Sequence, residues 1–146
     1  MRIQTLLSLG IVVLVLSLAG VQARAEDKTA KVTGTFTVPK ELDSIQAQVV
    51  EIRLYKIHPM IADKSADLVE LVEFKDFAHA KGVETKKEFV IGAKAKLDPE
   101  MKYYLTLFIL KDGQRTHMGQ VPGKFLITVL TQGNPDTVAI TVKKVR

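Results

Sequence analysis

The chain has 146 residues, with 21 lysines and arginines against 16 aspartates and glutamates, a formal net charge of +5, and neither cysteine nor tryptophan. The absence of cysteine excludes disulfides, a lipid-bearing cysteine and thiol-based catalysis or metal binding. The charge is modest and evenly spread, and with no tryptophan the sequence does not favour nucleic-acid binding.

Residues 1–25 have the pattern of a cleavable signal peptide. Arg2 precedes a run of apolar or small residues at 6–21, which is shorter than the roughly 20 residues that a membrane-spanning helix needs. Ala23 and Ala25 frame an Ala-x-Ala cleavage site, and the first acidic residue follows at once. An uncleaved signal anchor is the alternative. We therefore expect an exported protein, periplasmic or secreted, that does not span the membrane after cleavage.

A single domain is predicted over residues 26–146. Loss of Arg2 and Arg24 with the signal peptide lowers the 21 basic residues to 19 and leaves the 16 acidic ones, for a net charge of +3. A chain of 121 residues, 146 less 25, buries enough surface for one hydrophobic core but too little for two.

Apolar and polar residues alternate through most of this domain, which indicates half-buried strands rather than helices. Strands are expected at residues 31–38, 48–57, 68–74, 87–97, 103–110, 115–118, 125–130 and 137–142. Such spacing is typical of a sandwich or a small barrel. We predict an all-β fold, an antiparallel Greek-key β-sandwich of about eight strands.

Two local signals refine this prediction. Residues 103–110 are apolar on both faces, which places that strand centrally, and the following Asp112-Gly113 pair predicts a two-residue hairpin with a type I′ turn. The spacing of Leu97, Pro99 and Tyr103 matches a tyrosine corner, in which the tyrosine hydroxyl bonds to upstream backbone. The alternative is that Tyr103 is an ordinary strand aromatic.

The stretch 97–145 resembles the C-terminal half of the YbaY/YscW-type envelope proteins. It shares the proline-to-tyrosine spacing, the Asp-Gly hairpin and the run 129–135 before the last strand, and residues 32–36 are similar to that family's first strand. The resemblance implies a β-sandwich of the bacterial envelope. Some members are pilotins, lipoproteins that deliver secretin subunits to the outer membrane, and the cysteine that carries their lipid is absent here.

The sequence contains no recognisable catalytic motif. After residue 25 the serines are Ser44 and Ser65, both in loop-like contexts, and there is no Gly-x-Ser-x-Gly motif. A serine nucleophile needs a base and an orienting group within hydrogen-bond reach, which no spacing here suggests. We expect no enzyme and no cofactor, and no carbohydrate platform because tryptophan is missing.

A metal site is the most specific chemical hypothesis. His58, His79 and His117 fall in or beside predicted turns, and Met118 adjoins the last of them. Imidazole and thioether ligands suit copper. His79 and His117 with Met118 form the candidate set, because these two histidines can follow strands that run the same way. Two histidines and a methionine are a weak ligand set, so we expect no tight stoichiometric copper or zinc.

Two functions remain open from the sequence. The first is a non-catalytic envelope module that binds another protein through an exposed sheet edge or loop surface, with β-strand addition as the natural mode. The alternative is a small exported metal-binding protein that uses loop histidine and methionine. The small-molecule ligand, if one exists, is unknown.

We predict that the exported protein begins at Glu26. Signal peptidase cleaves after small residues, and Ala25 is the last residue of the Ala-x-Ala site. Intact-mass measurement of exported protein gives the N-terminus directly. A membrane-embedded species that retains Met1 contradicts the prediction.

Overall fold

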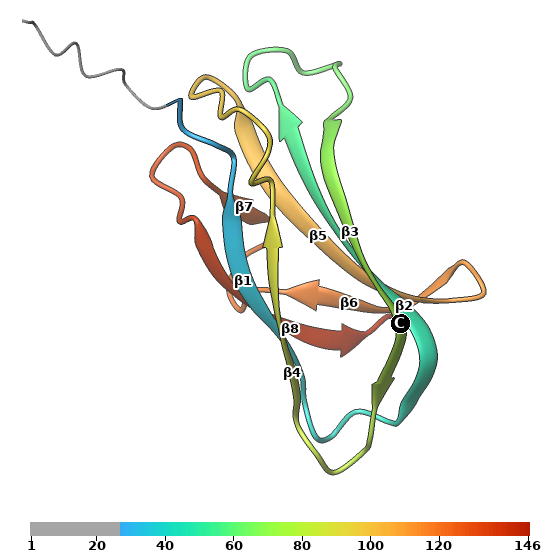
Figure 1. The fold of residues 1–146 in the computed structure, drawn as a ribbon. Coiled ribbons are helices and arrows are strands. Elements are labelled where there is room, and N and C mark those ends of the chain that lie inside the picture. The colour runs from blue at the N-terminus through green and yellow to red at the C-terminus, as the bar shows by residue number, and fades with distance from the viewer. Residues whose placement is uncertain (1–26) are drawn as a thin grey trace, which may run out of the picture.

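A computed structural model describes residues 27–146, so the predicted signal peptide and its cleavage site lie outside the described residues. This part of the chain folds into strands with no helix (Figure 1). The eight strands are β1 (Val32–Val38), β2 (Ile45–Ile57), β3 (Asp67–His79), β4 (Thr85–Ile91), β5 (Lys102–Lys111), β6 (Gln114–Gln120), β7 (Ile127–Val129) and β8 (Thr137–Lys144). Across residues 27–146, no helix is long and apolar enough to cross a membrane.

The strands form one mixed sheet that is nearly closed into a barrel. The hydrogen-bonded order is β3-β2-β5-β6-β8-β1-β4, and β7 pairs with β5 beside this path. The pairs are antiparallel except that β1 and β8 run parallel. The inner faces of β3-β2-β5 and of β8-β1-β4 point toward each other and enclose the core (Figure 1).

The all-β class and the eight strands are confirmed, whereas the predicted pair of antiparallel sheets is not what the structure shows. The two halves are joined because β6 bonds to β5 along one edge and to β8 along the other. Register shifts in the β2-β3 pair accompany positive φ angles at Ala47 (48°) and Asp76 (54°). Such bulges increase the local twist, which curls a sheet toward closure.

The predicted strand at 87–97 ends six residues early, at Ile91. Gly92 has a φ of 80°, a left-handed conformation that favours glycine. A Cβ atom on Gly92 would lie 2.0 Å from the carbonyl oxygen of Ala30. The chain therefore turns at Gly92, and Ala95 and Leu97 pack against the core from a loop rather than from a strand.

The core consists of the inward-facing residues of the strands. Large side chains with under 2% exposure include those of Phe36, Leu54, Tyr103, Leu107 and Ile140. Gly34 makes room for one of these contacts, because a Cβ atom there would lie 2.5 Å from Cζ of Phe89 in the neighbouring strand. The ring of Phe89 thus lies across β1, where any larger residue would displace it.

The two local signals from the sequence have different outcomes. β5 is central, bonded to β2, β6 and β7. Asp112 and Gly113 form a two-residue hairpin with φ angles of 50° and 76°, as a type I′ turn requires. The hydroxyl of the buried Tyr103 accepts a hydrogen bond from the Asp98 backbone N–H at 2.9 Å. Because all the strands belong to one sheet, this bond does not fix a crossover between two sheets.

We predict that Tyr103→Phe lowers the free energy of unfolding by about 1–2 kcal/mol, because it leaves the Asp98 N–H without its acceptor in a partly buried setting. Tyr104→Phe is the matched control. Tyr104 is half-buried on the outer face, where its ring stacks on Tyr55. Urea denaturation of both variants measures the difference. Equal midpoints for Tyr103→Phe and the unmodified protein contradict it.

Candidate functional site

The barrel is open between β3 and β4. These strands are consecutive in the chain, yet β3 is bonded to β2 and β4 is bonded to β1. They are therefore the two edge strands of the sheet. Within residues 27–146 no backbone ladder joins β3 to β4. We call the opening between residues 70–79 of β3 and 85–92 in and after β4 the seam. An unpaired strand edge presents backbone N–H and C=O groups to whatever approaches it.

Side-chain hydrogen bonds tie the two margins of the seam together at both ends. At one end the Glu70 carboxylate accepts the backbone N–H of Gly92, just beyond β4. At the other, Nδ1 of His79 lies 2.7 Å from the Thr85 hydroxyl. The seam is therefore an opening of fixed length. The eight residues from Thr85 to Gly92 span about 23 Å when extended.

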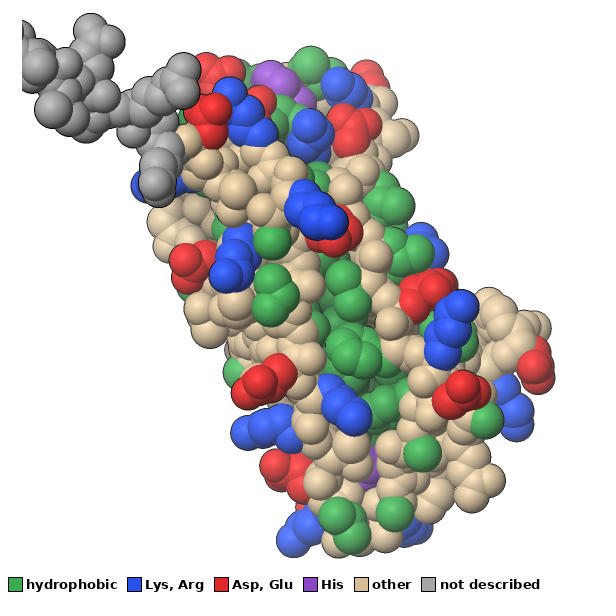
Figure 2. Space-filling view, in the orientation of Figure 1, with side chains coloured by type: hydrophobic (Ala, Val, Ile, Leu, Met, Phe, Trp, Pro, Cys, Tyr) green, Lys and Arg blue, Asp and Glu red, His purple; other side chains and the backbone are tan. Residues whose placement is uncertain are grey.

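The floor of the seam is aromatic. The ring of Phe36 on β1 lies 5.6 Å from that of Phe74 and 5.7 Å from that of Phe77, both on β3. Phe36 and Phe77 are buried, while Phe74 and Val72 on the same face of β3 are only half-buried. Figure 2 shows hydrophobic side chains along the centre of this face, between the positions of β3 and β4, with charged side chains around them.

One charged residue interrupts the inner face of β4. The alternation of the strand puts Thr85, Lys87, Phe89 and Ile91 on the inner face, and Lys87 is the exposed member of this set. Lys87 is paired in register with Phe36, so its side chain starts beside the aromatic floor. Among residues 27–146 it has no ion-pair partner. An ammonium group thus lies at the seam outside any ion pair of the described residues.

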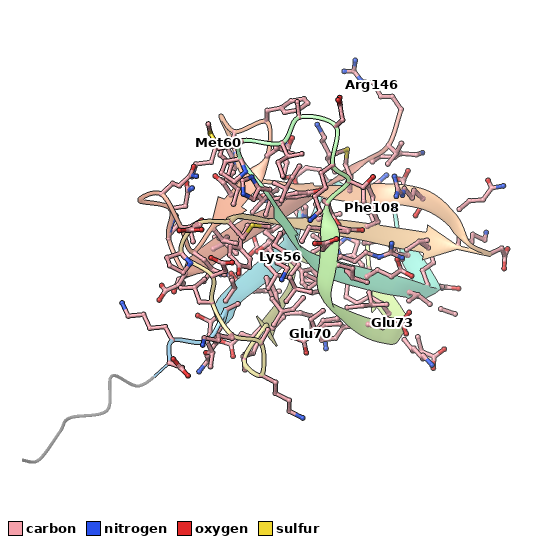
Figure 3. All side chains as sticks on the ribbon, turned by 90° about the horizontal axis from the view of Figure 1, so that it is seen from above. Lys56, Met60, Glu70, Glu73, Phe108 and Arg146 are labelled. Carbon is pink, nitrogen blue, oxygen red and sulfur yellow. The ribbon has the colours of Figure 1, made fainter. Side chains whose placement is uncertain are left out.

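The outer face of β2 and β5 is a separate surface. Figure 3 shows the labelled Glu70 and Glu73 of β3 on one side of the molecule and Phe108 and Arg146 away from them. Outer-face side chains cover one another: the rings of Tyr55 and Tyr104 stack at 5.2 Å, and the guanidinium of Arg115 lies 3.8 Å from the centre of the Phe108 ring. These contacts between outer-face side chains shield the apolar outer face of β5, which no other strand of residues 27–146 covers.

The structure places two of the three histidines at the end of a strand or within one. His79 is the last residue of β3 and His117 lies within β6, so neither is in a connecting loop. Both are buried, with exposed fractions of 4% and 7%. His58 is in the loop after β2, where its Nδ1 accepts the Met60 N–H. That loop lies at the opposite end of the molecule from the β3-β4 turn (Figure 1).

Met118 cannot complete a site with His117. Successive residues of a strand point to opposite faces, and here His117 is buried on the inner face while Met118 is half-exposed on the outer one. The Nδ1 atoms of His79 and His117 each lie within hydrogen-bond distance of a threonine hydroxyl. In the described part of the chain no three histidine, aspartate or glutamate side chains come together as a metal site requires. The histidine and methionine set therefore gives the copper hypothesis no geometric support.

The two buried histidines nevertheless lie in one electrostatic environment. Burial lowers the pKa of His117, and the nearby charges of Lys144 and His79 lower it further, whereas Asp43 opposes them. Asp43, in the loop between β1 and β2, itself pairs at 3.0 Å with Lys81 in the turn between β3 and β4. The Thr116 hydroxyl has one proton, which it donates to Gln48 or to the Ile109 carbonyl, and Nδ1 of His117 lies 2.9 Å from the same hydroxyl oxygen.

Sequence reasoning missed the residues that make the seam. The strand pattern predicted an exposed edge but not which edge, because pairing partners of β3 and β4 are not encoded locally. The sequence gives one sign of the seam: Lys87 lies two residues before Phe89 and four before Ile91, so a charged residue occupies a position of the alternation that is otherwise apolar. No signal in the sequence linked Glu70 to Gly92, 22 residues away.

No family model matches the sequence, and no curated protein matches it significantly. Among solved structures, the fold is similar to that of an alternative pilotin from the type II secretion system of Vibrio cholerae, with a TM-score of 0.57 and 16% sequence identity. The match covers 82% of this chain and 99% of that one. At this identity the likeness establishes a pilotin-like fold.

We predict that stability falls as the pH drops below about 6.5. The folded-state pKa of His117 is below its ordinary value of 6.5, so the unfolded chain binds the proton more readily and protonation favours unfolding. The loss begins near pH 6.5 and ends at the lowered pKa. Urea denaturation at pH 7.5 and pH 5 measures it, and His117→Asn should reduce the difference.

The matched control is His58→Asn, at the opposite end of the molecule. This substitution keeps an acceptor for the Met60 N–H and should leave the pH dependence unchanged. If His117→Asn and the unmodified protein lose equal stability between the two pH values, His117 is not the group responsible.

Proposed function

We propose that this protein is a non-catalytic binding module of the bacterial cell envelope that holds an extended segment of a partner protein in the seam between β3 and β4. The observation that carries the proposal is the pair of facing, unpaired strand edges above a half-buried aromatic floor. The partner segment adds as a strand, the mode called β-strand addition.

The backbone of the seam supplies the affinity in this proposal. Each free edge offers N–H and C=O groups that an extended segment can bond. Because the Glu70 to Gly92 and His79 to Thr85 bonds hold the ends, the edges are preorganised. Less conformational freedom is then lost on binding than for a flexible loop.

The floor supplies apolar contact. Val72 and Phe74 are half-buried, and the ring of Phe74 lies against that of the fully buried Phe36. A side chain that covers them removes the remaining apolar surface from water, which contributes about 25 cal/mol for each square ångström. Alternate residues of an extended segment point the same way, so a segment with apolar residues at every second position fits the seam.

Fold and targeting support the same conclusion. The signal-peptide pattern of residues 1–25 predicts export from the cytoplasm. The chain has a fold similar to that of a pilotin from a type II secretion system, and this likeness favours a protein-interaction role. The proposal concerns partner binding and does not include lipid attachment.

Site-specific photocross-linking tests the proposal. A benzophenone amino acid at Phe74 should form an adduct with a second protein in the native envelope, whereas the same group at Tyr104, an aromatic on the outer face, should not. Mass spectrometry should map the adduct to one short segment, and deletion of that segment from the partner should abolish the adduct.

Three outcomes contradict the proposal. The first is no adduct at Phe74, and the second is adducts of the same partner in equal yield from both positions. The third is an adduct that joins two copies of this chain, which makes the seam a self-association surface.

A further inference from the structure

We propose that the segment bound in the seam carries a carboxylate side chain opposite Lys87, with apolar side chains two residues before and after it. This inference rests on the proposed function and adds the chemistry by which the seam selects its occupant. It makes Lys87 a specificity-determining residue of the binding site.

The position of Lys87 is the first support. In the β1-β4 register Lys87 is directly opposite Phe36, and directly opposite residues of a ladder project to the same face. Phe36 contacts Phe74 across the seam. The lysine stem therefore starts at the middle of the opening, and an added strand on the β4 edge brings one of its residues directly beside Lys87.

The charge of the site is the second support. Lys87 has no ion-pair partner among the described residues, and it differs from the other unpaired lysines in its position, because it lies on the inner face of β4 opposite Phe36. Glu70, the acidic residue on the inner face of β3, already accepts the Gly92 N–H at the end of the seam. A bound segment shields Lys87 from water, so the ammonium group then needs a counter-charge that the segment itself must supply.

The neighbours of Lys87 define the rest of the segment. Phe89 and Ile91 follow it on the inner face of β4, and Val72 and Phe74 line the opposite margin. These residues favour apolar side chains on both sides of the carboxylate. The length of the opening limits the segment to about seven extended residues.

Lys87 has one competing explanation that uses no partner. An inward-pointing charge on an edge strand is a common device against edge-to-edge aggregation. A guard of this kind opposes the approach of an apolar strand because a charge must be desolvated, and the sign of that charge does not matter. Reversal of the lysine charge therefore separates the two explanations, because a guard works with either sign and a recognition group does not.

The test uses three capped seven-residue peptides, Thr-Val-Thr-Xaa-Thr-Val-Thr, in which the central residue is aspartate, alanine or lysine. Amide chemical shifts of the exported protein, titrated with each peptide, report both affinity and location. We expect the aspartate peptide to bind through β3 and β4 amides about tenfold more tightly than the alanine peptide, and the lysine peptide to bind most weakly.

Three variants complete the design. Lys87→Glu should reverse the order of the three peptides, and Lys87→Gln should abolish the preference without reversing it. Lys86→Glu is the matched control, because Lys86 is the exposed neighbour on the outer face of the same strand and makes the same change in net charge. It should leave the order unchanged.

Each failure has a distinct meaning. Binding of all three peptides at the seam with equal affinity overturns the role of Lys87, leaves strand addition intact and identifies the lysine as an edge guard. If Lys86→Glu also reverses the order of the three peptide affinities, net charge alone explains the preference, and the inference is overturned. Absence of any shift in β3 and β4 amides overturns both the inference and the proposed function.

Discussion

The architecture depends on one pairing choice: β3 and β4 follow each other in the chain but bond to different neighbours. A hairpin that pairs with itself would have closed the barrel between them. Here β3 is held by β2 and β4 by β1, and both strands contribute residues to one core. The aromatic contacts of Phe36 with Phe74 and Phe77 bridge the two margins without backbone bonds. The opening exists because side chains, rather than a ladder, join its edges.

Gly92 links this opening to the rest of the molecule. Its left-handed backbone ends β4, its N–H reaches the Glu70 carboxylate across the seam, and its lack of a side chain lets the Ala30 carbonyl approach. The segment before β1 is tied to the following loop by bonds between Ala30 and Ala95 and between Leu97 and Lys28. The end of the seam is thus fixed by contacts among three segments distant in sequence.

The buried histidines illustrate how a ligand type in a sequence can serve another purpose. His79 bonds to Thr85 and thereby closes the second end of the seam, while His117 anchors β6 through Thr116 and Gln48. Both histidines lie on the inner face of the sheet, and each has a threonine hydroxyl within hydrogen-bond distance of its Nδ1. Residue type suggested copper, but the alternation of the strand separated His117 from Met118.

The sequence by itself determined the all-β class, the eight strands, the central place of β5 and the hairpin at Asp112-Gly113, because alternation and turn chemistry are local properties. The Tyr103 bond to Asp98 spans five residues and was predictable for the same reason. Only the tertiary structure decided that β6 joins both halves into one sheet, that β1 runs parallel to β8, and that Lys87 faces an open seam. Those features depend on which strands pair across long stretches of chain. The alternation of apolar and polar residues identifies a strand but does not specify its pairing partner.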